Sequence, residues 1–125
     1  MQGNLNATKA KYQENLDIDQ LVKQIPNDRT LLNNLSIAAA RLGDVLKAQG
    51  DLNGANAQYS TKLTIIQKLI KDEPGNGRWR RELAVSYENL GHVMQVQGDF
   101  SGAKAQYTNA LEINRERASQ DAGRA

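Results

Sequence analysis

The chain has 125 residues, with 16 Lys and Arg against 14 Asp and Glu, one His and no Cys. This is the length of one domain, long enough to form a hydrophobic core without disulfides or metal. The lack of Cys excludes disulfide scaffolds, thiolate zinc sites and cysteine nucleophiles. Because no apolar run approaches the ~20 residues of a membrane span and the N-terminus lacks a signal-peptide pattern, we expect a soluble, cytoplasmic protein without a membrane partner.

An internal repeat organises the chain. Residues 49–59, QGDLNGANAQY, return as residues 97–107, QGDFSGAKAQY, at an offset of 48. Leu42-Gly43 returns as Leu90-Gly91 at the same offset, and a weaker copy opens the chain. A repeat of this length indicates stacked helical units rather than one globular core. We therefore divide the single domain, residues 1–125, into a partial repeat over 2–34 and two repeats over 35–82 and 83–123.

The predicted elements alternate between two helical patterns, called A for the first helix of a repeat and B for the second. The chain begins with a B helix over residues 4–26, which Pro26 ends. An A helix follows over 29–49, with apolar residues three or four positions apart. Gly50 suits the left-handed residue that ends a helix, and a B helix over 52–73 comes after it.

The second full repeat has the same two helical patterns. An A helix is predicted over residues 78–97 and ends before Gly98, and Asp99 can cap a B helix over 100–120. No segment shows the sustained alternation of a strand. The sequence therefore predicts an all-α chain of five antiparallel helices in the order B-A-B-A-B.

Small and aromatic residues recur at fixed places in this pattern. Gly43 and Gly91 let an A helix approach its partner closely. Tyr12, Tyr59 and Tyr107 are predicted to fill the space between successive repeats, because a single helical pair cannot bury both of its faces.

This pattern resembles the tetratricopeptide repeat (TPR), a helix-turn-helix unit that stacks into an α-α superhelix. The residues that carry the resemblance in the second full repeat are Tyr87, Leu90, Gly91, Met94, Gly98, Asp99, Phe100, Ala103, Tyr107, Ala110 and Leu111. The first full repeat departs from the pattern, with Ala39 in place of a large residue and Lys62 in place of a small one. The period of 48 exceeds the usual length of about 34, so the unit is similar to the extended repeats of kinesin light chains and of bacterial regulatory repeat proteins.

The resemblance implies a protein-protein interaction scaffold that binds a peptide or a helix along a concave groove lined by A helices. The groove residues that it implies are Ile37, Ala40, Arg41, Asp44, Lys47, Val85, Glu88, Asn89, His92 and Gln95. This lining is mixed in charge and does not match the lysines and asparagines with which some TPR proteins clamp a C-terminal carboxylate. His92 would give binding at this groove a pH dependence.

Glu88 and His92 share a helix face at a spacing of four residues, as part of a metal site or an acid-base pair would. Two ligands are too few for a metal, and no nucleophile motif or phosphate-binding loop accompanies them. We expect no catalysis, no metal and no cofactor.

The densest basic feature is Arg78-Trp79-Arg80-Arg81, a combination of residues that can bind nucleic acid. The other interpretation is that Trp79, which aligns with Leu31, packs against the preceding B helix while the arginines are solvated. A net charge of +2 does not favour nucleic acid as the leading partner, so we prefer the packing interpretation.

Both ends of the chain are B helices whose outer faces risk exposure. Near the C-terminus three apolar positions become polar or small, since Asn114, Arg117 and Ala118 replace the residues 48 positions earlier. The first helix keeps the apolar residues Leu16, Ile18, Leu21 and Val22. The alternative function is therefore a structural or self-associating segment of a larger signalling protein, which forms homo-oligomers through its terminal helices and has no ligand groove of its own.

Overall fold

The computed structural model describes residue 24 and residues 27–124, and this part of the chain is all-helical, without strands. It contains four helices: α2 (Arg29–Ala48), α3 (Leu52–Asp72), α4 (Gly77–Gln97) and α5 (Phe100–Arg124). Their bounds agree with the predicted ranges to within one residue, except that α5 continues past the predicted end at residue 120. The predicted first helix, 4–26, lies outside the described residues.

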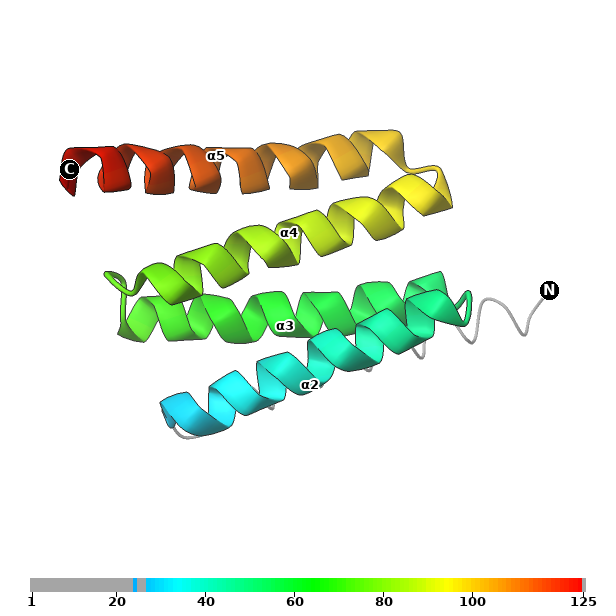
Figure 1. The fold of residues 1–125 in the computed structure, drawn as a ribbon. Helices are drawn as coiled ribbons and strands as arrows, with labels where there is room; N and C mark the ends of the chain where they lie inside the picture. The colour runs from blue at the N-terminus through cyan, green and yellow to red at the C-terminus, as the bar shows by residue number, and fades with distance from the viewer. Residues whose placement is uncertain (1–23, 25–26, 125) are drawn as a thin grey trace.

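The four helices form a bundle in which each lies beside the next in chain order and runs antiparallel to it (Figure 1). α3 packs on α2 and on α4, and α4 packs on α3 and on α5. The two outer helices, α2 and α5, therefore each have a side that no other described helix of the stack covers.

The turns from α2 to α3 and from α4 to α5 have the same geometry. Gly50 and Gly98 both adopt the left-handed conformation, with φ of 85° and 86°, which favours glycine because it has no Cβ. The aspartates that follow, Asp51 and Asp99, each accept a hydrogen bond of 2.9 Å from the backbone N–H three residues later. These side chains satisfy N–H groups that have no partner within the helix. The predicted glycine and aspartate signals thus place both turns.

One core cluster lies where α3 meets the beginnings of α2 and α4. It contains Leu32, Ile65, Ile66, Leu69 and Trp79. Trp79 is buried, and its indole N–H donates a hydrogen bond of 3.2 Å to Glu73. This confirms the interpretation that Trp79 packs against the preceding B helix.

The second core cluster joins α3 to the second half of α4 and contains Ala55, Tyr59, Leu90 and Val93. The Tyr59 ring also lies against α2, where a Cβ added to Gly43 would stand 2.7 Å from a ring carbon. The predicted close approach at Gly43 is therefore present, and an aromatic ring of the B helix makes it.

Lys62 is buried, although it stands where the TPR pattern has a small residue. Its ammonium nitrogen lies 3.0 Å from a carboxylate oxygen of Glu82 on α4. Because a buried charge is costly unless paired, this ion pair accounts for a lysine inside the α3–α4 interface.

Candidate functional site

The predicted groove residues lie on the A helices, five on α2 and five on α4, and none of them is buried. They are Ile37, Ala40, Arg41, Asp44 and Lys47 on α2, and Val85, Glu88, Asn89, His92 and Gln95 on α4. Their side chains are thus accessible, as a binding surface requires, and the two helices differ in what surrounds them.

On α2, two of the predicted groove residues contact the core tyrosine of α3. The Tyr59 hydroxyl donates a hydrogen bond to the Asp44 carboxylate, and the Lys47 ammonium lies 6.0 Å from the centre of the Tyr59 ring. Burial raises the pKa of Tyr59 above its ordinary value, and the hydrogen bond and the charge of Asp44 act in the same direction. Asp44 therefore has a role in packing α2 on α3.

On α4 the tyrosine has a different partner, because the residue 48 positions after Asp44 is His92 and not a second aspartate. The Tyr107 hydroxyl donates instead to the side-chain oxygen of Gln95, at 3.1 Å. The Tyr107 ring lies against Gly91, where an added Cβ would stand 3.0 Å away. Unlike the fully buried Tyr59, Tyr107 remains 37% exposed.

Two adjoining cavities open at the junction of α4 and α5, with volumes of about 400 and 430 Å³, and Tyr107 and Leu111 line both. We call them together the α4–α5 hollow. The residues that line it are Glu88, His92, Gln95, Phe100, Ala103, Lys104, Tyr107, Thr108, Ala110, Leu111 and Asn114. The structure therefore places three predicted groove residues, all from α4, beside apolar side chains of α5.

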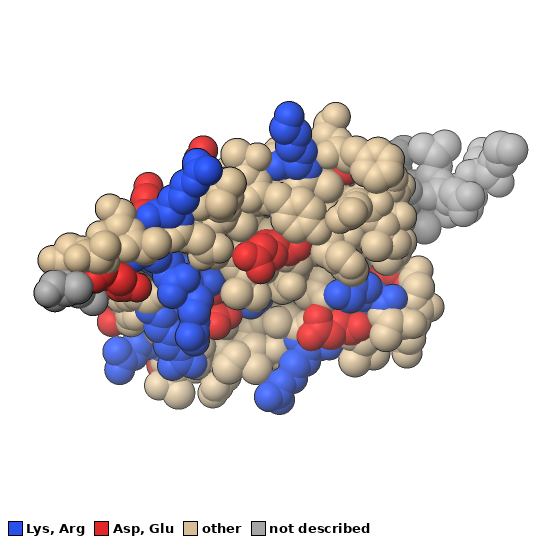
Figure 2. All heavy atoms as spheres, turned by 45° about the horizontal axis from the view of Figure 1, so that its top comes forward, with Lys and Arg blue, Asp and Glu red and all other residues tan. Residues whose placement is uncertain are grey.

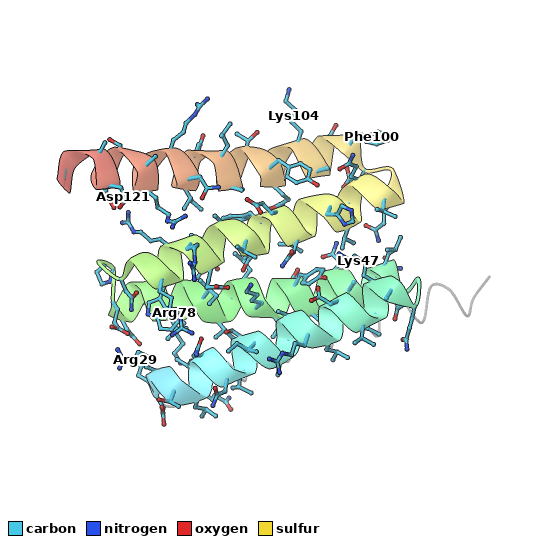
Figure 3. The ribbon with its side chains drawn as sticks, in the orientation of Figure 1. Arg29, Lys47, Arg78, Phe100, Lys104 and Asp121 are labelled. Carbon is cyan, nitrogen blue, oxygen red and sulfur yellow. The ribbon has the colours of Figure 1, made fainter. Side chains whose placement is uncertain are left out.

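The apolar part of this hollow is strongly exposed, with Phe100 at 71% and Leu111 at 49%. Figure 3 shows Phe100 at the start of α5, with Lys104 pointing away from α4. In Figure 2, which brings α5 toward the viewer, mainly uncharged side chains cover the end where α5 begins, and Lys and Arg gather toward its other end.

Three residues of the hollow were not predicted to belong to the binding surface: Phe100, Tyr107 and Leu111. The Tyr107 ring contacts α4 of its own repeat, and no described helix follows α5, so the prediction that it fills the space to a next repeat stays a prediction. Tyr12 lies outside the described residues. The internal repeat nevertheless indicates that the three positions in the hollow are apolar contact positions. The three residues stand 48 positions after Leu52, Tyr59 and Leu63, which pack in the α3–α4 cluster.

The arginines of the predicted basic cluster do not converge on one site. The Arg78 guanidinium lies 5.1 Å from the centre of the Trp79 ring. Arg78 also lines one cavity with Arg29, at the start of α2 (Figure 3). Arg80 lies 4.0 Å from Glu116 of α5 and lines a separate cavity of about 360 Å³, together with Arg117 and Asp121. This cavity carries both signs of charge.

Within residue 24 and residues 27–124, no three His, Cys, Asp or Glu side chains come together as a metal site would need. In the same part of the chain, none of the helices has the length and apolar character to cross a membrane. The predicted self-association residues Leu16, Ile18, Leu21 and Val22 lie outside the described residues.

Comparison with protein families, curated proteins and solved structures finds no match to this chain.

Proposed function

We propose that the chain is a protein-protein interaction scaffold built from extended TPR-type units, in which α2–α3 and α4–α5 are successive A–B pairs of an α-α superhelix. Two features support this proposal. The turn within each pair has the same glycine and aspartate geometry. In each pair a tyrosine ring of the B helix lies against a glycine of the A helix. The sequence pattern predicts one more B helix, 4–26, which precedes α2 in the chain and would bring the number of helices to five.

The proposed binding site is the α4–α5 hollow with its polar border of Glu88, His92 and Gln95. One observation carries this choice: Tyr107 and Leu111 are exposed directly beside side chains that donate and accept hydrogen bonds. Apolar anchors supply most of the binding energy at such surfaces, and polar groups at the edge fix the register of the bound segment. The ligand class is therefore a peptide or a helix with apolar side chains on one face.

A peptide array of helical and extended segments, probed with the purified chain, tests this function. We compare the wild type with Leu111→Ala, which removes an apolar side chain from the hollow, and with His92→Ala at its border. Val96→Ala is the matched control, because Val96 is exposed and lines neither cavity.

The Leu111 variant should weaken binding of the selected peptides by about tenfold or more, as expected for a central apolar anchor. The control should bind like the wild type. Equal binding by all variants, or an array without any bound peptide, would contradict the proposed site.

The alternative function, self-association, is favoured by a different observation: the outer sides of both α2 and α5 expose large apolar residues, such as Val45 and Phe100. In this role the chain would join copies of itself or extend a longer array, through its terminal helices.

A further inference from the structure

The outer side of α5 repeats the side of α3 that α4 covers. Leu52, Tyr59 and Leu63 of α3 pack in the cluster that contains Leu90 and Val93 of α4. Their counterparts 48 positions later are Phe100, Tyr107 and Leu111, the apolar residues of the α4–α5 hollow. The hollow is therefore a place where a helix with the apolar pattern of α4 would fit.

That pattern is present and exposed on α2. Leu42 and Val45 are 46% and 51% exposed, whereas their counterparts on α4, Leu90 and Val93, are 3% and 0% exposed against α3. Leu31 is likewise exposed, and its counterpart Trp79 is buried. Among the described helices, the two ends of the stack thus expose the two halves of an interface that already exists between α3 and α4.

We propose that the α4–α5 hollow binds α2 of a second copy of this chain, in the arrangement in which α3 binds α4. This inference rests on the proposed function, since it assigns a partner to the same site. We call the surface of Leu31, Leu42 and Val45 the head face, and the surface of Phe100, Tyr107 and Leu111 the tail face.

The charges at the two faces are compatible with this contact. The α3–α4 interface contains the Lys62–Glu82 ion pair, and losing one partner of such a pair would leave a buried charge. At the tail face Ala110 stands in the position of Lys62, and at the head face Asn34 stands in that of Glu82. Neither the lysine nor the glutamate is present at these positions, so the contact between copies leaves no unpaired charge there.

A polar contact at the end of the interface is also matched. The Gln97 side chain on α4 donates a hydrogen bond of 3.0 Å to Asn53 on α3. The counterparts are Gln49, just after α2, and Ser101 in α5. A glutamine amide and a serine hydroxyl can form the same kind of hydrogen bond between copies.

The contact is head-to-tail, because it joins two different surfaces. A copy bound through its head face keeps a free tail face, so further copies can add and the assembly grows into a filament or closes into a ring. Its mass therefore depends on concentration, which distinguishes it from a two-fold dimer that stops at two copies.

Sedimentation velocity of the full chain, from micromolar to millimolar concentration, tests the proposal with two blocked variants. Leu42→Glu with Val45→Glu blocks the head face, and Phe100→Glu with Leu111→Glu blocks the tail face. All four residues are exposed, so circular dichroism should show an unchanged fold. Val96→Glu, the control, places one glutamate at an exposed position outside both faces.

We expect the wild type and the Val96 control to exceed the 13.8 kDa of one chain as concentration rises, and each blocked variant alone to remain a monomer. An equimolar mixture of the two blocked variants should form a dimer and nothing larger, because one intact head face meets one intact tail face.

Three results would overturn the proposal. A wild type that is monomeric at millimolar concentration would show that the two faces do not bind each other between copies. A head-blocked variant that still dimerises would indicate a two-fold contact between tail faces. A mixture that stays monomeric would exclude the pairing itself. Peptide binding to a monomeric chain would leave the proposed function standing, so the two failures are distinguishable.

Discussion

The same substitution at two equivalent glycines should have different effects on stability. Gly43 and Gly91 stand 48 residues apart, each in the interior of an A helix and each against a tyrosine ring of the following B helix. Replacing a helix-interior glycine by alanine stabilises a helix by about 1 kcal/mol when there is room for the methyl group. The two sites differ in the space that is left for this methyl group.

At Gly43 the new methyl carbon would stand 2.7 Å from the Tyr59 ring, which is fully buried and bonded through its hydroxyl to Asp44. The ring has no open space to move into, so an overpacking cost of about 1–3 kcal/mol applies. After subtraction of the helix propensity gain, Gly43→Ala should lower the free energy of unfolding by about 1 kcal/mol.

At Gly91 the corresponding distance is 3.0 Å, and the Tyr107 ring is partly exposed at the hollow. A movement of a few tenths of an ångström relieves this contact, so most of the propensity gain of about 1 kcal/mol remains. Gly91→Ala should therefore be neutral or stabilising. The difference between the two variants is about 2 kcal/mol, or about 8 °C in Tm for a domain of ~100 residues.

Thermal and urea unfolding followed by circular dichroism measures this difference, at concentrations low enough to keep the chain monomeric. Equal effects at the two glycines, or a larger loss at Gly91, would refute the reasoning that the mobility of the ring decides the outcome.

Two further predictions concern groups inside the α3–α4 interface. Glu82→Asn leaves the Lys62 ammonium buried without its partner and should lower the free energy of unfolding by roughly 2–3 kcal/mol. The loss is smaller than for a fully buried pair, because the Glu82 side chain is 30% exposed. Adding Lys62→Ala should recover most of this loss in urea unfolding, and a double variant as unstable as the single one would contradict the ion-pair account. The pKa of Tyr59 is raised in the folded state, so folding favours the neutral form of this side chain. The resulting contribution to the free energy of unfolding is complete below pH 10.0, the ordinary pKa of tyrosine. Above that pH the contribution falls by up to about 1.4 kcal/mol per pH unit. Tyr59→Phe should lose that part of the alkaline decline, and unfolding curves with the same pH dependence in both proteins would argue against it.

Local signals in the sequence placed the four described helices correctly, because the turns within each pair depend on backbone geometry that few residues allow. Gly50 and Gly98 adopt the left-handed conformation, and Asp51 and Asp99 bond to the helix that follows. Each of these requirements is met within three residues, so it can be read from the sequence alone.

The repeat pattern did not reveal which apolar positions are covered. Tyr59 and Tyr107 occupy the same place in the repeat, yet only Tyr59 is buried, because α4 packs over it. Burial depends on what lies beyond a helix, whereas periodicity reports only which side of the helix is apolar. For the same reason Lys62 looked like a departure from the pattern, and its pairing with Glu82 on the next helix became evident only from the fold.

Two polar residues near the end of α5 oppose the proposed contact between copies, which leads to a last prediction. Asn114 and Arg117 stand 48 positions after Ile66 and Leu69, which belong to the core. The Arg117 guanidinium also donates a hydrogen bond of 3.2 Å to Asn114, so these polar groups are partly satisfied within one copy. A second copy that covers them would have to remove water from both side chains, which opposes docking over this half of the helix.

Replacing both residues by the apolar residues of α3, as Asn114→Ile with Arg117→Leu, should therefore strengthen the contact between copies. Each buried side chain of this size contributes about 1.5–3 kcal/mol, so tightening of at least about tenfold is expected. Ser119→Leu is the control. Ser119 is exposed on α5, and its counterpart 48 positions earlier, Lys71, is exposed on α3. Sedimentation velocity measures the association, and an equal gain in the control would mean that added apolar surface alone, rather than the restored α3 pattern, drives it.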